Sequence, residues 1–169
     1  LFRKGVDCVI HTKILDPFAR YIILKAAIND KIYILISVYT PNKDKDITHF
    51  FDNLLTTMQN ENLDEEENIT VGGEFNCPLN TLLNKKGGIM IPRKSVVASI
   101  GCIQSALDLA YIWRVKYPWN GRNVALIFYP LFFQQIVKNA STQSYTWSQT
   151  PPNIFCSLDH WLISNNLQD

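Results

Sequence analysis

The sequence lacks the closely spaced ligands that mark structural metal sites and dithiol redox sites. Its cysteines are few and far apart, at Cys8, Cys77, Cys102 and Cys156, and none of them belongs to a CxxC pair. A zinc site or a redox motif needs Cys or His residues a few positions apart. The spacing therefore predicts neither kind of site and favours a reducing compartment. We expect an intracellular protein, either nuclear or cytoplasmic.

The sequence also lacks an apolar run of the length that a bilayer requires. Residues 124–137, VALIFYPLFFQQIV, are strongly apolar, but Pro130 interrupts them and they fall short of the roughly 20 residues of a membrane-spanning helix. No membrane partner is therefore expected. This apolar stretch is an aggregation hazard where it is exposed.

A strong charge of one sign is missing as well. The net charge of the whole chain is +1, so no overall field predicts a polyanionic partner. The distribution is uneven, because residues 1–75 hold 8 Lys/Arg and 12 Asp/Glu whereas residues 76–158 hold 8 and 1. The second part could therefore face a polyanion such as nucleic acid. The equally simple alternative is a sheet whose solvated loops are basic.

What the sequence does have is enough apolar material for one buried core. It contains 169 residues, of which 47% are hydrophobic and 12% aromatic. A globular chain of this size fits one ordinary domain. We therefore treat residues 1–169 as a single domain.

The pattern of the first half predicts strands followed by a helix. Residues 21–28 and 32–39 are two β-rich runs joined by a polar turn at 29–31, which favours a hairpin. A helix is predicted next, with Asp46 as its N-cap, because apolar residues recur with helical spacing. This apolar stripe consists of Ile47, Phe50, Phe51, Leu54, Leu55 and Met58. A weaker helix is predicted at 95–104.

Polar residues then follow or interrupt two predicted strands. The strand ITV at 69–71 is expected to break at the double glycine that follows, which would deliver Glu74 and Asn76 to the rim of a sheet. A late strand, IFCSLDHWLIS at 154–164, carries Asp159 near its centre. Strands that alternate with helices, together with the early hairpin, predict a mixed α/β domain.

Five short motifs occur in the order of a known family. They are VYTPN at 38–42, GGEFN at 72–76, IWRVKYP at 112–118, YTW at 145–147 and SLDHWLIS at 157–164. Taken together, and across almost the whole chain, they resemble the endonuclease/exonuclease/phosphatase superfamily, and within it the endonuclease domain of LINE-type non-LTR retrotransposons. The segment DPFARYIILK at 16–25 resembles the family's upstream segment.

The resemblance implies a deoxyribonuclease-like, four-layer fold, in which a two-sheet β-sandwich is flanked by helices. Its active site lies at one end of the sandwich and is built from loops at the strand edges. The implied activity is a metal-dependent nick in DNA, with Mg²⁺ or Mn²⁺ as the cofactor. The chain would be a single partial domain that lacks the N-terminal and C-terminal strands of the fold, and its remaining partner would be the rest of a retrotransposon polyprotein with a reverse transcriptase.

The resemblance also assigns roles to individual residues. Glu74 stands where the family has the aspartate that orients and deprotonates the attacking water, and Asn76 stands where an asparagine holds a phosphate oxygen. Tyr39 would donate a hydrogen bond to the scissile phosphate, and Asp159 would brace the site. Phosphodiester hydrolysis needs such carboxylates, amides and donors around a hard cation. The substrate-binding matches are Asn42 and Thr146.

Each of these residues also has a purely structural interpretation. Tyr39 fits the core of a strand, Asp159 a solvated acid beside a turn, and Thr146 an ordinary β-branched strand residue. His160 is assigned to packing alone. His11 and His49 are interpreted as surface residues of a strand and a helix.

Several departures from the family predict an impaired activity. The family's metal-binding glutamate and its late catalytic histidine have no counterpart among these residues, so the metal ligands are unknown. Glu74 is one methylene longer than the family's aspartate, and a misplacement of about 1 Å can cost on the order of a hundredfold in rate. Tyr111 occupies a position that the family usually fills with aspartate, and residues 119–144 form an atypical apolar insertion in place of the family's short connection.

Three functions remain open at this point. The first is a Mg²⁺-dependent, DNA-nicking endonuclease domain. The second is a decayed, non-catalytic remnant that binds nucleic acid weakly, which salt-sensitive DNA binding without cleavage would favour. The third is the same fold acting on a lipid or small-molecule phosphoester, which a preference for a generic phosphodiester over duplex DNA would favour.

Overall fold

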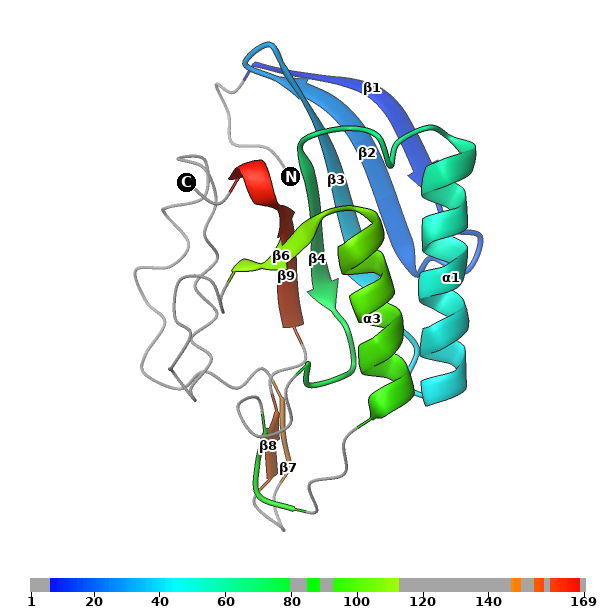
Figure 1. Ribbon diagram of the computed structural model, residues 1–169, viewed down its shortest axis with the longest axis vertical. Coiled ribbons are helices and arrows are strands. Elements are labelled where there is room, and N and C mark those ends of the chain that lie inside the picture. The colour runs from blue at the N-terminus through cyan, green and yellow to red at the C-terminus, as the bar shows by residue number, and fades with distance from the viewer. Residues whose placement is uncertain are drawn as a thin grey trace.

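A computed structural model describes residues 7–79, 85–88, 93–112, 147–149, 154–156 and 159–167. Its largest feature is a six-stranded mixed sheet in the order β1-β2-β3-β4-β9-β6 (Figure 1). The strands are β1 (Cys8–Leu15), β2 (Tyr21–Ile28), β3 (Lys31–Tyr39), β4 (Ile69–Glu74), β9 (Asp159–Ser164) and β6 (Leu109–Tyr111). The predicted mixed α/β class is confirmed.

The predicted hairpin is formed by β2 and β3, which pair antiparallel along their whole length. In its turn, Asn29 and Asp30 both have the left-handed backbone conformation, with φ of 50° and 64°. Asn and Asp tolerate this conformation better than most side chains, and its twist suits a two-residue hairpin loop. β3 then pairs parallel with β4, so the segment between them must cross over the sheet.

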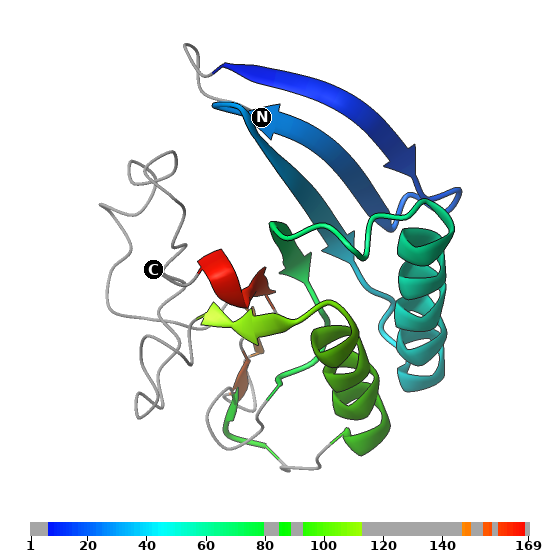
Figure 2. The same ribbon diagram turned by 45° about the horizontal axis from the view of Figure 1, so that its top comes forward.

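Two helices cover one face of this sheet (Figure 2). They are α1 (Asp44–Asn60), which makes the crossover, and α3 (Lys94–Ala106), which packs beside it and confirms the weaker predicted helix. The predicted apolar stripe is the inner side of α1, where only Leu55 is less than fully buried. The prediction that Asp46 caps α1 was wrong, because the helix begins two residues earlier. Asp46 lies in the first turn, where a carboxylate interacts favourably with the helix dipole.

The core lies between the sheet and these helices. Alternate residues of β3 and β4 point towards the helices, as the period of two of a strand requires. They are at most 4% exposed and comprise Ile34, Ile36, Val38, Ile69 and Val71. Burying each such side chain stabilises the fold by about 1.5–3 kcal/mol. This core fixes the positions of the strand ends, where the candidate site lies.

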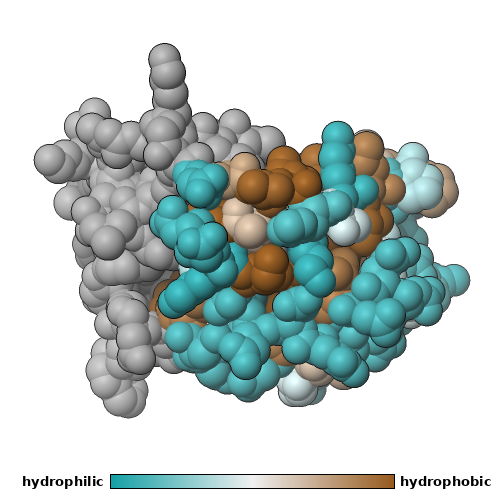
Figure 3. Space-filling model, turned by 90° about the horizontal axis from the view of Figure 1, so that it is seen from above, coloured by the Kyte–Doolittle hydropathy of each residue, from teal (hydrophilic) through white to brown (hydrophobic). Residues whose placement is uncertain are grey.

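The opposite face of the sheet carries exposed apolar side chains. Leu15 and Ile22 are paired across β1 and β2, and they are 55% and 41% exposed. Apolar residues are also visible between hydrophilic ones when the molecule is seen from above (Figure 3). In the part of the chain that the structure describes, no second sheet covers this face over β1 and β2. A smaller sheet of β5 (Lys85–Lys86), β8 (Ile154–Cys156) and β7 (Trp147–Gln149) lies beyond the ends of β4 and β9 (Figure 1).

The double glycine does not end β4, as the sequence had suggested. The strand runs through both glycines to Glu74. A Cβ atom on Gly72 would lie 2.1 Å from the ring of Trp161, and one on Gly73 would lie 2.1 Å from the carbonyl oxygen of Val38. The glycines are therefore positions of close approach inside the sheet, where any side chain would clash.

Replacing Gly73 by alanine is expected to destabilise the fold by at least about 2 kcal/mol, because its φ of 135° strains any side chain and the clash is with backbone. Gly101→Ala is the matched control. Gly101 lies inside α3 with nothing within 4 Å of its Cβ position, so alanine there should stabilise the helix by up to about 1 kcal/mol. Urea unfolding of both variants measures the difference; equal stabilities would contradict the observed approach of β3 to Gly73.

The predicted late strand is divided between the two sheets. Its first part is β8 of the smaller sheet, and its second part is β9 of the main sheet. Asp159 was expected near the centre of the strand but is the first residue of β9. It therefore lies at the end of the main sheet rather than within it.

Two predicted features lie outside the described residues, namely the apolar insertion at 119–144 and the substrate-binding position Thr146. Among the helices that the structure does describe, none combines the length and the apolar character needed to cross a bilayer.

Candidate active site

Three predicted site residues form a row across the end of the main sheet. Tyr39 is the partner of Glu74 in the parallel ladder of β3 and β4, and Glu74 is the partner of Asp159 in the antiparallel ladder of β4 and β9. Directly paired residues present their side chains on the same face of a sheet. The row therefore places a phenol and two carboxylates side by side, on the face away from the helices. The alternative of Tyr39 as a core residue was wrong, since it is 49% exposed.

Glu74 is the half-buried member of this row. Burial raises the pKa of its carboxyl above the usual value, and the negative charge of Asp159 on the neighbouring strand raises it further. Both causes oppose ionisation of the carboxyl. A carboxylate whose pKa is shifted towards neutrality is a better proton acceptor, which suits the predicted general base.

Glu74→Gln is expected to stabilise the fold slightly at pH 7 without divalent ions. A raised folded-state pKa means that ionisation of Glu74 favours the unfolded chain, so stability is lost as pH rises through that pKa. The free energy of unfolding should rise by about 0.2–1 kcal/mol, which is the range typical of exposed charge pairs. This gain should vanish below about pH 4. Glu65→Gln, in the exposed loop before β4, is the control. Urea titrations at both pH values test this, and an equal gain at pH 4 would contradict it.

Asn76 follows β4 and is held in an unusual backbone conformation. Its φ is 48°, in the left-handed region, and its side chain is buried. The side-chain Nδ2 donates to the carbonyl oxygen of Thr40 at 2.6 Å, while the Thr40 N–H donates to the Glu74 carbonyl oxygen at 2.9 Å. One hydrogen of the carboxamide is therefore engaged, and its second hydrogen and its oxygen remain as hydrogen-bonding groups.

Thr40 contributes a further polar group beside Asn76. The residue is fully buried, and its hydroxyl Oγ1 has no hydrogen-bond partner among the described residues. A buried hydroxyl without a partner loses about 1–3 kcal/mol of hydration. Among the described residues, Thr40 Oγ1 is the one buried side-chain polar atom that lacks a hydrogen-bond partner.

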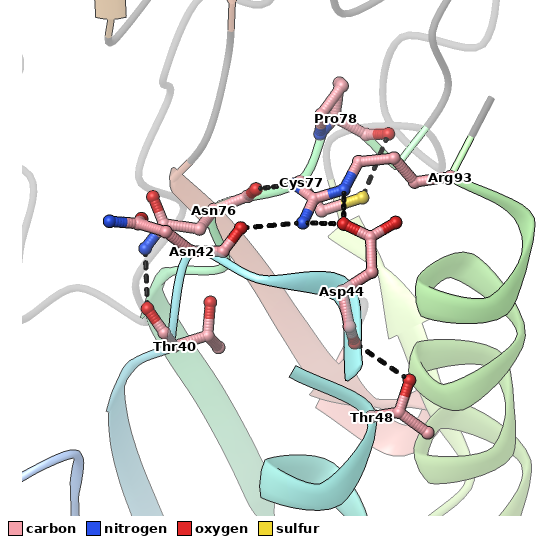
Figure 4. Close-up of polar contacts among 8 residues, drawn as sticks. All are labelled: Thr40, Asn42, Asp44, Thr48, Asn76, Cys77, Pro78 and Arg93. Atoms are coloured by element: carbon pink, nitrogen blue, oxygen red, sulfur yellow. Dashed lines mark hydrogen bonds and ion pairs between the residues drawn. The ribbon is translucent and has the colours of Figure 1, made fainter. Parts of the chain in front are cut away.

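The backbone around Asn76 is held from two sides. Arg93 Nη1 donates to the Asn76 carbonyl oxygen at 2.5 Å (Figure 4). The next carbonyl oxygen, of Cys77, accepts from Nε2 of His160 at 2.9 Å. Left-handed non-glycine residues cost about 1–3 kcal/mol and persist where the surroundings hold them. Such strained, over-determined backbone is typical of functional sites.

The assignment of His160 to packing alone was wrong. Its Nε2 must carry the hydrogen, because the carbonyl of Cys77 can only accept. In the neutral ring, Nδ1 then accepts from the hydroxyl of Tyr111 at 3.0 Å. His160 is 1% exposed and packs edge-on against Phe75. Tyr111 thus completes a hydrogen-bond chain that braces the loop after β4.

Tyr39 is oriented by the turn between β1 and β2. Its backbone N–H donates to the Arg20 carbonyl oxygen at 2.8 Å, and the Arg20 guanidinium lies 5.4 Å from the centre of its ring. Asp16 holds this turn, because its Oδ2 accepts from the backbone N–H of Arg20 at 2.9 Å. A contact of this kind, with a cation over an aromatic face, is favourable by about 0.5–1 kcal/mol at exposed sites.

The buried thiol next to Asn76 is not a nucleophile. Burial raises the pKa of Cys77 to about 11, although the nearby Arg93 charge lowers it. The thiolate is the reactive form of cysteine, so Cys77 stays protonated and inert near neutral pH. Its contribution to the site is the carbonyl that His160 holds.

Comparisons with known proteins identify the fold. No protein-family profile and no curated protein matches the sequence, but solved structures resemble it. The endonuclease domain of TRAS1, a telomere-specific non-LTR retrotransposon, has a TM-score of 0.54 at 11% identity, over 99% of this chain and 59% of that one. An AP endonuclease from Archaeoglobus fulgidus has a TM-score of 0.60 at 13% identity, over 97% and 68%. TDP2 of D. rerio, complexed with a single-strand DNA product, has a TM-score of 0.54 at 10% identity, over 94% of this chain and 55% of that one.

The chain has the fold of the endonuclease/exonuclease/phosphatase superfamily. The predicted deoxyribonuclease-like fold is confirmed. The chain spans between 55% and 68% of the length of these three structures.

The resemblance had implied Mg²⁺ or Mn²⁺ as the cofactor. Among the described residues there is no group of three or more His, Cys, Asp or Glu side chains placed to hold a metal. Two carboxylates, Glu74 and Asp159, nevertheless face each other across β4 and β9, and their repulsion contributes to the raised pKa of Glu74. A cation between them would relieve this repulsion, and Mg²⁺ commonly binds through one or two carboxylates and several waters.

The structure thus brings together most of the residues that the sequence had singled out. Tyr39, Glu74 and Asp159 are neighbours, Asn76 lies two residues beyond Glu74, and Asn42 follows β3 in the adjacent loop. Sequence reasoning missed three residues that hold these positions: Thr40, Arg93 and the hydrogen-bonding role of His160. Thr40 and His160 lie inside quoted motifs, but the local sequence does not reveal these roles, because each residue acts through a contact at a sequence separation of 17 or more.

Proposed function

We propose that this chain is the central part of a divalent-metal-dependent phosphodiesterase that nicks DNA, as in the endonuclease domain of a non-LTR retrotransposon. The observation that carries the proposal is the row of Tyr39, Glu74 and Asp159 at one end of the sheet, with Asn76 directly beyond it. The likeness to the TRAS1 endonuclease domain supports the retrotransposon class. The likeness to TDP2 with bound DNA supports a nucleic-acid partner.

In the proposed reaction, Glu74 accepts a proton from water, whose oxygen attacks the phosphorus. The bond from phosphorus to one ester oxygen breaks, and that oxygen takes up a proton from solvent. Asn76 and Tyr39 donate hydrogen bonds to the non-bridging oxygens, where negative charge develops. Asp159 braces the site from the neighbouring strand, and Asn42 and Thr146 bind substrate.

A divalent cation supplies charge neutralisation at the phosphate when it is bound. Within this chain, Glu74 and Asp159 fit such an ion, as hard oxygen donors with like charge. Neither the family's glutamate ligand nor its late histidine has a counterpart among the 169 residues. We therefore propose that this span alone is impaired and that the natural polypeptide supplies the remaining groups.

Supercoiled plasmid tests the proposal. The natural polypeptide that contains these residues is incubated with plasmid and Mg²⁺ or Mn²⁺, with and without EDTA, and the nicked circles are quantified. We expect metal-dependent nicking that EDTA abolishes. Salt-sensitive plasmid binding without cleavage would instead support a non-catalytic remnant. Faster hydrolysis of bis(p-nitrophenyl) phosphate than of DNA would support a lipid or small-molecule substrate.

A further inference from the structure

One arginine joins three segments beside the candidate site. Arg93 directly precedes α3, and its guanidinium makes three separate hydrogen bonds (Figure 4). Nε donates to Oδ1 of Asp44 at 2.7 Å, Nη1 donates to the Asn76 carbonyl oxygen at 2.5 Å, and Nη2 donates to the Asn42 carbonyl oxygen at 3.0 Å. These acceptors belong to the first turn of α1, the loop after β4 and the loop after β3.

Only an arginine can make this set of contacts. The guanidinium presents five N–H donors in a rigid plane, so it reaches acceptors in several directions at once. A lysine ammonium is a single point donor on a flexible stem. In Figure 4 the guanidinium lies between the Asp44 carboxylate and the backbone of Asn42 and Asn76. Lysine could keep the ion pair with Asp44 but could not hold both carbonyls in place.

The two carbonyl groups belong to residues of the proposed substrate-binding edge. Asn76 is in the left-handed conformation, so the direction of its peptide group sets where its carboxamide points. Its Nδ2 donates a hydrogen bond to the Thr40 carbonyl oxygen, which connects the loop after β4 to the end of β3. The Arg93 bond to Asn42 fixes the other side of the same edge. Without the guanidinium, the two loops would lose their shared contact.

Arg93 is not placed to act on a substrate itself. Its side chain is 24% exposed, and its charge is paired with Asp44 through Nη2 and Nε. Its effect on the site must therefore be exerted through the backbone of Asn42 and Asn76. The residues it orients are those that face the phosphate in the proposed reaction.

We propose that Arg93 is the positioning residue of this site, which holds Asn76 and Asn42 in register for phosphate binding. This inference rests on the proposed function, because the positions it fixes matter for catalysis only if the site hydrolyses a phosphodiester. A displacement of about 1 Å in a catalytic group can cost on the order of a hundredfold in rate. Loss of Arg93 should therefore act mainly on kcat, through Asn76, and KM should change only by the small contribution of Asn42 to substrate binding.

The kinetic test compares R93K, D44N and K94A in the natural polypeptide. R93K should lower kcat for plasmid nicking by about a hundredfold, with KM within about twofold. D44N keeps both carbonyl contacts and should lower kcat by no more than about fivefold, as expected for a partly exposed ion pair. K94A, at the neighbouring exposed residue, is the matched control and should nick at the wild-type rate. A wild-type kcat in R93K would overturn the proposal.

A second measurement does not require activity. Hydrogen exchange by NMR reports on the Asn76 carboxamide, which is bonded to Thr40, and on the backbone amide of Ile36 in the core of β3. R93K should lose protection at the Asn76 carboxamide by at least about tenfold and keep it at Ile36. Equal protection at Asn76, or equal loss at both sites, would overturn the positioning role. If the wild type shows no nicking, the proposed function fails, and this measurement still decides the role of Arg93.

Discussion

Removal of the Asn76 carboxamide is expected to lower the rate of DNA nicking by about a hundredfold or more. A single donor to a developing negative charge is typically worth a factor of 10²–10³ in kcat. Asn76→Gly is the appropriate variant, because glycine accepts the left-handed φ of 48° without strain. The variant deletes the side chain and keeps the backbone carbonyl that Arg93 holds.

The control for this prediction is Asn53→Gly or Asn53→Ala on the exposed side of α1. Asn53→Ala should leave nicking unchanged and should not destabilise the helix. Asn76→Gly should destabilise the fold by only about 1 kcal/mol, the net worth of one hydrogen bond. Initial rates on supercoiled plasmid, normalised to the folded fraction, separate the two effects. A normalised rate within threefold of the wild type would remove Asn76 from the proposed mechanism.

Phe75→Ala is expected to have the largest effect on stability, a loss of about 3–5 kcal/mol. Phe75 is fully buried between the two predicted site residues Glu74 and Asn76, and its ring packs against Phe51 of α1 and His160 of β9. Truncation would leave a cavity at the junction of helix and sheet. Because a small domain is stable by only about 5–15 kcal/mol, the variant should be near the limit of folding.

Phe18→Ala is the matched control, because Phe18 is 83% exposed in the turn between β1 and β2. Its replacement should change the free energy of unfolding by no more than about 0.5 kcal/mol. Thermal or urea unfolding of both variants provides the comparison. Similar losses at the two positions would show that the ring of Phe75 is not part of the core.

The sequence predicted those features of the fold that depend on local patterns. The helical stripe of α1 and the hairpin of β2 and β3 follow from spacing and turn chemistry alone, and both are confirmed. The double glycine was misread as a strand end because glycine is common in turns. The glycines are needed because the ring of Trp161 and the carbonyl oxygen of Val38 approach them closely. Both contacts join residues that are far apart in the sequence, so no local pattern reveals them.

The candidate site was predicted only in part, because local patterns place single residues but do not show which strands pair. Glu74 ends a strand and Asn76 follows it, and their place at one end of the sheet could be inferred from the sequence. Their pairing with Tyr39 and Asp159 depends on ladder register between separate strands, which only the resemblance suggested. The contacts of Arg93 could not be predicted, because a lone arginine before a helix is usually a solvated side chain.

The most direct test of the central claim is the pH dependence of single-turnover nicking by the natural polypeptide, with Glu74 intact, as Glu74→Asp and as Glu74→Gln. We expect the wild-type rate to rise with pH through a single inflection, as the Glu74 carboxyl ionises to the form that accepts a proton. Glu74→Asp should raise the rate, and Glu74→Gln should lower it by about 10²–10⁴ and abolish the inflection. A wild-type rate and pH profile in Glu74→Gln would contradict the account.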